Sequence, residues 1–294
     1  VEHYSDLAEE VARFYGYNQI PTTAMTGVTT RGGYSPEQML ERSLGTVCRS
    51  LGYDEIITYS FISPTYYDKI RLPEDSPLRK SMKIMNPLGE DTSIMRTTVM
   101  PSMLEILTRN YNYRNKEAHL YELGRTYFER EDGMADEPKH LSLGVYGPEE
   151  SFFTLKGMAE TVADVLNISF TYEKAEKPFL HPYQTAAIFC EGEEIGYFGK
   201  VKYEIMKDEA MREDAYVLEI SMKALEKWYG KAPVFEPLPK FAEEKRDLAL
   251  VMDKEITCGQ VEECIKAASP FVKDVTLFDV YEGKQILANK KSMA

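Results

Sequence analysis

MNPLGEDTSIMRTTVMPSMLEILTRNYNYRNKEAHLYELGRTYFER, residues 85–130, is the stretch of sequence that decides the fold. Asn86-Pro87-Leu88-Gly89 is typical of a turn, because proline fixes φ and glycine tolerates positive φ. A short extended run follows over 93–99, and Pro101 suits the first position of a helix with an apolar stripe. The apolar and aromatic run 120–128 indicates a buried strand. Together these elements predict a strand–helix–strand unit of an α+β core.

The same stretch resembles a known family. The matching residues, in order and spacing, are Asn86-Pro87-Leu88, Glu90-Asp91, Met95-Arg96-Thr97, Pro101 and Tyr121-Glu122-Leu123-Gly124-Arg125. This pattern is similar to the catalytic-like module of the bacterial phenylalanyl-tRNA synthetase β subunits. The resemblance implies an antiparallel sheet of the class II aminoacyl-tRNA synthetase type, flanked by helices, over residues 26–232.

The bulk properties leave room for more than one domain. The chain has 294 residues, of which 43% are hydrophobic, and a formal net charge of −13. Because the sequence-independent part of nucleic-acid binding comes from Lys and Arg, an acidic chain needs a local patch or a partner to contact RNA. Neither DNA nor a membrane is expected as a partner.

Cysteine usage and the termini point to the cytoplasm. The four cysteines, at 48, 190, 258 and 264, form no CxxC pair, so neither a zinc site nor a disulfide framework is predicted. No run of about 18 apolar residues and no signal-peptide pattern occurs. The chain begins at Val1 and not at Met, which indicates a fragment of a longer protein.

Residues 1–25 are predicted to hold a helix and the start of a linker. Asp6 and Glu9 fit a capping box, and Gly16 sits where the helix should end. Asp6, Glu9 and Glu10 then lie on one side of the first turn. From the residues alone two interpretations stay open: acids that complement the helix dipole, or carboxylate ligands of a hard cation such as Mg²⁺.

The resemblance favours the second interpretation. The pattern is similar to the last helix of the helical module that precedes the catalytic-like core, where four acidic residues are associated with Mg²⁺. Asp6, Glu9 and Glu10 match the last three of those positions, and the first position would lie before Val1. The resemblance therefore implies a magnesium role for these three residues, with one ligand missing.

The core has further local signals. Ser35-Pro36-Glu37-Gln38 predicts a capped helix, and Asp54–Ile62 is rich enough in β-branched and aromatic residues for one strand. This helix and strand resemble the dimerising first motif of class II synthetases, although packing explains the apolar stripe of the helix equally well. Phe152–Leu166 predicts a second helix, and residues 187–201 predict a β-hairpin.

The proline-rich connector 233–239 is the clearest predicted domain boundary. Strands over 246–252 and 272–281, with a helix capped by Thr257 between them, resemble the first half of a ferredoxin-like anticodon-binding domain over 233–294. Half of such a sheet has an unpaired edge and an uncovered apolar face. We therefore predict weak order over 236–294, or support from a neighbouring chain.

The chain is not expected to catalyse a reaction alone. Aminoacyl-adenylate formation needs guanidinium groups on the ATP phosphates, and the resemblance places Phe128 where the catalytic α subunit has such an arginine. The implied function is the non-catalytic β part of phenylalanine–tRNA ligase, in a heterotetramer of two α and two β chains. The partner α subunit would bind ATP, and both would bind tRNA(Phe). The alternatives are a free-standing tRNA-binding or scaffold module and a self-sufficient class II ligase.

Overall fold

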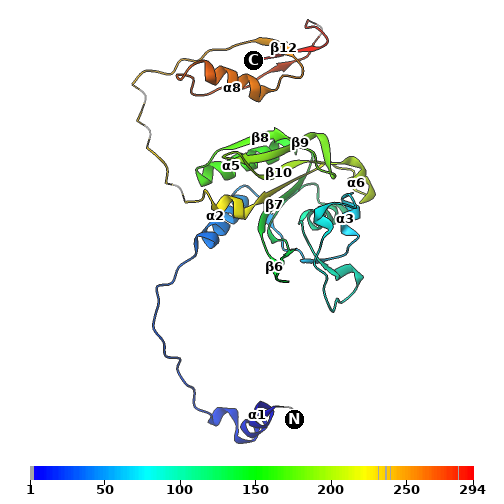
Figure 1. The fold of residues 1–294 in the computed structure, drawn as a ribbon, viewed down its shortest axis with the longest axis vertical. Helices are drawn as coiled ribbons and strands as arrows, with labels where there is room; N and C mark the ends of the chain where they lie inside the picture. Colours follow the sequence, from blue (N-terminus) through cyan, green and yellow to red (C-terminus); the bar gives the residue numbers. More distant parts are fainter. Residues whose placement is uncertain (1–2, 231, 236, 239, 284) are drawn as a thin grey trace. The chain divides into compact units, whose positions relative to one another are not determined.

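The computed structural model describes residues 3–230, 232–235, 237–238, 240–283 and 285–294. It divides into two compact units, Val1–Pro233 and Val234–Ala294. The division falls at the start of the proline-rich connector (Figure 1). The boundary at residue 25 stays a prediction.

A seven-stranded sheet forms the centre of the first unit, in the order β1-β4-β7-β11-β10-β9-β8. Neighbouring strands are antiparallel, except that β1 and β4 run parallel. The turn between β9 and β10 closes the predicted hairpin. The strands are β1 Asp54–Glu55, β4 Ala118–Arg125, β7 Lys139–Tyr146, β8 Phe170–Lys174, β9 Leu180–Cys190, β10 Glu193–Val201 and β11 Ala215–Ser221.

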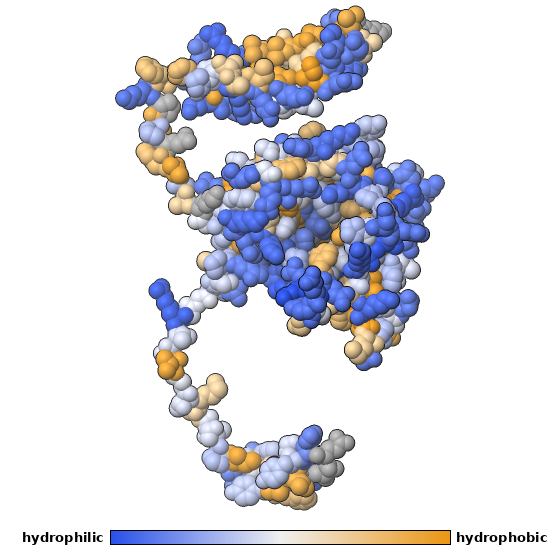
Figure 2. Space-filling model, viewed as in Figure 1, coloured by the Kyte–Doolittle hydropathy of each residue, from blue (hydrophilic) through white to orange (hydrophobic). Residues whose placement is uncertain are grey.

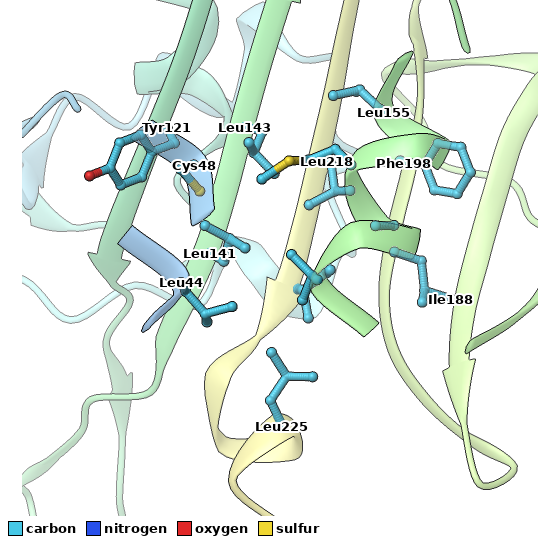
Figure 3. Packing of buried hydrophobic residues seen from close by; sticks show 14 of the residues in the cluster. Leu44, Cys48, Tyr121, Leu141, Leu143, Leu155, Ile188, Phe198, Leu218 and Leu225 are labelled. Carbon is cyan, nitrogen blue, oxygen red and sulfur yellow. The ribbon is translucent and has the colours of Figure 1, made fainter. Parts of the chain in front are cut away.

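One face of the sheet is covered by α2 (Pro36–Ser50), α5 (Phe152–Leu166) and α7 (Met222–Glu226). Strand side chains alternate between faces, so Tyr121 and Leu218 join this layer. Figure 3 shows them beside Leu44 of α2 and Leu155 of α5. Ser35 caps α2 through the predicted capping box, and the bounds of α5 agree with the prediction.

The opposite face is covered by α3 (Tyr66–Lys69), α4 (Met100–Asn112) and α6 (Tyr203–Asp208). Here Gly144 of β7 lets α4 approach closely, because a Cβ at this position would lie 2.7 Å from Met103 Sδ. The predicted α+β class, with helices flanking a mainly antiparallel sheet, is confirmed.

The predicted single strand Asp54–Ile62 is wrong. Its first residues form β1 beside β4, whereas Phe61–Ile62 forms β2 and pairs with β3 (Ile94–Met95). The two parts belong to different sheets because the chain between them is held by side chains: Thr58 Oγ1 donates to Glu122 Oε2 at 2.7 Å. Composition predicts extended backbone here but not its pairing partners.

The strand predicted over 120–128 is also divided. β4 ends at Arg125, and the Tyr127 N–H turns away to donate to the Arg96 carbonyl at 2.9 Å. Phe128 then begins a two-stranded arm. The remaining elements of this unit are α1 Tyr4–Tyr15, η1 Tyr17–Gln19, η2 Pro77–Arg79, η3 Glu90–Thr92, β5 Phe128–Glu129 and β6 Ala135–Asp136.

In the described residues of the second unit, helix α8 accompanies a three-stranded antiparallel sheet in the order β12-β14-β13. The predicted strands are shorter than expected, because β14 pairs with four residues of β12 and two of β13. Met252 and Met293 are its buried hydrophobic residues among those described, and Figure 2 shows apolar side chains at its surface. The elements are β12 Leu250–Asp253, α8 Cys258–Ala268, β13 Val280–Tyr281 and β14 Lys290–Met293.

Candidate functional site

The two halves of the sequence motif meet inside the first unit. Arg96, just after β3, is 2% exposed, and its Nη2 lies 2.9 Å from Glu122 Oε1 on β4. Its Nη1 donates to Thr58 Oγ1 at 2.6 Å and its Nε to the Arg125 carbonyl at 2.8 Å. One buried guanidinium thus joins β3, β4 and the chain after β1. We call Arg96, Glu122 and Thr58 the arginine clasp.

The motif glycine belongs to the same arrangement. A Cβ on Gly124 would lie 2.8 Å from Arg96 Nη2 and 3.0 Å from Glu122 Oε1. Both are closer than ordinary van der Waals contact, so a side chain here would displace the ion pair. Thr97, the next motif residue, is held separately by the Tyr67 hydroxyl at 2.9 Å. Of the motif residues that the sequence aligned, Arg96, Glu122 and Gly124 are therefore packed against one another, whereas Leu88 is exposed.

A row of polar side chains crosses the sheet from the arginine clasp. Glu122 on β4 lies opposite Ser142 on β7, which lies opposite Glu219 on β11, and Glu219 lies opposite Tyr197 on β10. Burial and then the Glu219 carboxylate raise the pKa of the Tyr197 hydroxyl well above its usual value. Ser142 and Glu219 were missed from sequence, although each interrupts the apolar pattern of its strand.

Two buried atoms next to this row have no hydrogen-bond partner in the described part of the chain: Ser142 Oγ and His140 Nε2. His140 Nδ1 lies 4.0 Å from Glu219 Oε1, and Thr98 Oγ1 donates to Glu219 Oε2 at 3.3 Å. The Arg96 guanidinium at the start of the row is already bound by the protein.

The arrangement holds segments together, and both of its guanidinium groups, those of Arg96 and Arg125, have protein partners. Arg125, beside the arginine clasp, donates to the Glu137 carbonyl at 3.2 Å and lies 3.7 Å from the Glu137 carboxylate. Phe128 lies on β5, which pairs with β6 outside the seven-stranded sheet. The motif thus performs a structural task here.

The predicted metal residues lie on α1, and the side chains of Asp6 and Glu10 are engaged with protein partners. The N-cap is His3 and not Asp6, which was predicted to start the capping box; Asp6 Oδ2 accepts from the His3 N–H at 3.2 Å. Glu10 Oε2 lies 2.6 Å from Arg13 Nη2. Within the described residues no three His, Cys, Asp or Glu side chains form a group that could hold a metal ion. The arrangement of Asp6, Glu9 and Glu10 does not fit Mg²⁺ as it stands, and their role stays a prediction.

The comparisons with known proteins agree with the motif. The family model of the phenylalanyl-tRNA synthetase beta chain CLM domain matches residues 20–222, and that of the ferredoxin-fold anticodon binding domain matches residues 239–294. The second match supports the fold predicted for the end of the chain. No helix in the described ranges has the length and apolar character needed to cross a membrane.

Curated relatives cover nearly all of this chain. It is 39% identical to a phenylalanine–tRNA ligase beta subunit of Clostridium tetani and 38% identical to one of Clostridium acetobutylicum, each over 98% of this chain and 37% of the relative. The beta subunit of Thermotoga maritima is 31% identical, over 100% of this chain and 38% of the relative. The chain thus spans less than two fifths of these relatives, and it belongs to the phenylalanyl-tRNA synthetase beta chain family.

Proposed function

We propose that this chain is a non-catalytic part of phenylalanine–tRNA ligase, the enzyme that attaches phenylalanine to its tRNA in the cytoplasm. It would assemble with an α subunit that binds ATP and carries out the chemistry, in a complex of two α and two β chains. The observation that carries the non-catalytic role is the arginine clasp: the guanidinium of Arg96 is buried and bound on three sides by protein groups.

The charge arrangement supports this assignment. Phosphoryl chemistry depends on cations that face the reacting phosphates. In this chain the carboxylates Glu122 and Glu219 line the polar row, and carboxylates repel phosphate. Phe128 occupies the position that the resemblance assigns to the phosphate-binding arginine, and it offers no charge.

The second unit would contribute to tRNA binding. Its match to the ferredoxin-fold anticodon binding domain supports a role in seating the anticodon arm. The magnesium site predicted for Asp6, Glu9 and Glu10 would require Asp6 and Glu10 to leave their present partners, so no step of the function is assigned to the metal.

Co-expression with the α subunit from the same organism tests this proposal. A tagged form of this chain should retain the α subunit through affinity purification and gel filtration. ATP–pyrophosphate exchange dependent on phenylalanine should require the α subunit and be absent with this chain alone. Phe128→Arg should not confer exchange, because Arg96 and Glu122 would still form the arginine clasp.

Each alternative has its own outcome in this experiment. Exchange catalysed by this chain alone would support a self-sufficient class II ligase and reject the non-catalytic role. Binding of tRNA without any stable association with the α subunit would support a free-standing tRNA-binding module.

A further inference from the structure

One segment departs from the acidic character of the chain. Residues 106–116 read ILTRNYNYRNK, with three basic residues, two tyrosines, three asparagines and no Asp or Glu, in a chain with a net charge of −13. Basic, aromatic and amide side chains in alternation are the groups with which proteins contact phosphates and bases. The segment forms the second half of α4 and the turn that follows it.

The turn is fixed by two hydrogen bonds and one ring contact. Asn115 Nδ2 donates to Asn110 Oδ1 at 2.8 Å, and the Tyr146 hydroxyl donates to the Asn115 carbonyl at 3.1 Å. Tyr111 packs edge-on against Tyr146 with ring centroids 6.0 Å apart. The remaining residues of the turn are thereby presented outward on a fixed backbone.

These outward residues have no internal partners. Tyr113 is 78% exposed, and Arg114 and Lys116 are exposed as well. Among the residues that the structure describes, the side chains of Arg114 and Lys116 make no ion pair, and the Asn112 amide makes no hydrogen bond. Their binding capacity is therefore available to a ligand.

A surface hollow of about 390 Å³ adjoins the turn. This is within the range of about 300–1,000 Å³ common for small-molecule sites. Thr108 lines the hollow and is 6% exposed, yet its Oγ1 has no hydrogen-bond partner in the described part of the chain. The residues around the hollow are Glu105, Thr108, Arg109, Asn112, Tyr113 and Glu209.

The charges in the hollow are balanced internally. Glu105 accepts from the Tyr66 hydroxyl at 2.5 Å and from Arg109 Nη2 at 3.1 Å. Glu209 lies 3.7 Å from Lys69 Nζ. The hollow therefore suits an uncharged polar group, whereas Arg114 and Lys116, which follow its lining residue Tyr113 in the turn, suit an anion. A nucleotide combines these two properties.

We propose that the hollow and the turn 112–116, together the α4 surface, bind single-stranded RNA. One base stacks on Tyr113, with Asn112 and Thr108 hydrogen-bonded to the base edge, and the adjoining phosphates lie against Arg114 and Lys116. This proposal rests on the tRNA-binding role given above, and it names the part of the first unit that contacts the RNA.

Fluorescence anisotropy with a labelled single-stranded RNA of about 12 nucleotides tests the proposal, because such surfaces cover about 4–16 nucleotides. Tyr113→Ala should weaken binding about 5- to 140-fold, since a stacked base contributes about 1–3 kcal/mol. Tyr113→Phe, which keeps the ring, should bind as the wild type does. Replacing both Arg114 and Lys116 by Ala should lower the salt slope of log K by about 1.4, at about 0.7 per phosphate contact.

Matched control variants test whether the loss of binding is specific to the α4 surface or follows from removing any exposed tyrosine or any two positive charges. Tyr59→Ala removes a tyrosine that is 83% exposed, and Arg212→Ala with Lys223→Ala removes the same charge from exposed positions elsewhere. Both control proteins should bind the RNA with wild-type affinity and salt slope. All the substituted side chains are exposed, so the variants should fold, which circular dichroism would verify.

Wild-type affinity in both Tyr113→Ala and the double variant would overturn the proposal, and so would an equal loss of affinity in the control proteins. A loss of affinity in the double variant with none in Tyr113→Ala would also overturn it. That result would indicate a site for any anion, such as an acidic peptide. If the wild-type chain binds no RNA, the RNA-binding part of the proposed function fails as well. Retention of the α subunit is measured separately on the same variants and does not depend on this result.

Discussion

Arg96 and Glu122 form an ion pair with 2.9 Å between Nη2 and Oε1, with side chains only 2% and 4% exposed. They lie 26 residues apart in sequence and come from β4 and the chain just after β3. A buried charge is costly unless it is paired and hydrogen-bonded, and here the guanidinium has three acceptors. The two residues therefore depend on each other for stability.

Removing one charge of this pair should be strongly destabilising. Arg96→Met leaves the Glu122 carboxylate buried without its cation, so we expect a loss of about 3–5 kcal/mol in the free energy of unfolding. Urea unfolding followed by the fluorescence of Trp228, the single tryptophan, reports on the first unit.

A double variant distinguishes the ion pair from simple packing. Arg96→Met combined with Glu122→Leu should lose less stability than the sum of the two single changes, because no unpaired charge remains. Additive losses would show that the two side chains contribute independently. Arg212→Met, at an exposed position, is the control and should stay within about 0.5 kcal/mol of the wild type.

Two glycines should respond in opposite directions to the same substitution. A Cβ on Gly196 of β10 would lie 2.2 Å from the Glu219 carbonyl oxygen, which belongs to the neighbouring strand. Gly196→Ala must therefore separate β10 from β11, and we expect a loss of several kcal/mol, about the upper range for point changes.

Gly157 provides the matched case. It lies exposed within α5, with nothing within 4 Å of an added Cβ. Gly157→Ala should stabilise the unit by about 0.5–1 kcal/mol, because alanine loses less backbone entropy in a helix. Thermal unfolding measures both variants, and destabilisation by Gly157→Ala would contradict the packing described for α5.

Stability should fall at alkaline pH. Burial, followed by the hydrogen bond to Glu105, raises the pKa of the Tyr66 hydroxyl to about 12. Burial likewise raises the pKa of the Cys48 thiol to about 12. Because both folded values exceed the unfolded ones, their stabilisation is complete below about pH 8 and is lost as the pH rises towards 12.

Urea unfolding between pH 8 and pH 11.5 measures this effect. Tyr66→Phe should make the decline above about pH 10 shallower, because the proton-linked contribution of this hydroxyl is gone. Tyr113→Phe, which removes an exposed hydroxyl, should leave the profile of the wild type. An unchanged slope in Tyr66→Phe would contradict the assignment.

The second unit should exchange its amide hydrogens faster than the first. Its buried hydrophobic residues in the described ranges are Met252 and Met293, whereas β4, β7 and β11 lie between two helical layers. Hydrogen exchange followed by mass spectrometry should show protection in β7 and little in β12–β14. Cooperative protection of residues 250–253 and 290–293 equal to that of β7 would contradict the predicted weak order.

Magnesium should bind α1 only weakly in this chain. Asp6 and Glu10 have partners within the helix, and Glu9 adds one carboxylate. We expect no saturable shift of the α1 amide signals in nuclear magnetic resonance below about 1 mM Mg²⁺, near the weak end of protein divalent-cation sites. Saturation at micromolar Mg²⁺ that is abolished by Glu9→Gln would instead establish the site.

Local signals in the sequence predicted the two longest helices of the core, α2 and α5, whereas the short helices α3 and α6 were not predicted. Ser35, Pro36 and Gln38 define the start of α2 through contacts within four residues. The bounds of α5 followed from its apolar periodicity alone. The family resemblance supplied the class of fold, because the motif spacing is fixed by the strands that it joins.

Pairing between distant residues could not be predicted in the same way. Nothing in Asp54–Ile62 indicates that Glu55 pairs with β4 while Phe61 pairs with β3, since strand composition does not specify a partner. Likewise, the sequence identified Arg96 and Glu122 as residues of the family motif but did not indicate that they form an ion pair. Their contact depends on the register of β4, which only the folded sheet defines.

The arginine clasp also restricts which amino-acid substitutions this chain can accept during evolution. Adding an arginine at Phe128 would place a cation on the β5–β6 arm, while Arg96 would stay bound to Glu122, Thr58 and the Arg125 carbonyl. Freeing Arg96 for a phosphate would first cost a large part of the roughly 5–15 kcal/mol by which proteins are stable. A mutational path that frees Arg96 therefore passes through strongly destabilised intermediates, which favours keeping this guanidinium in its structural position.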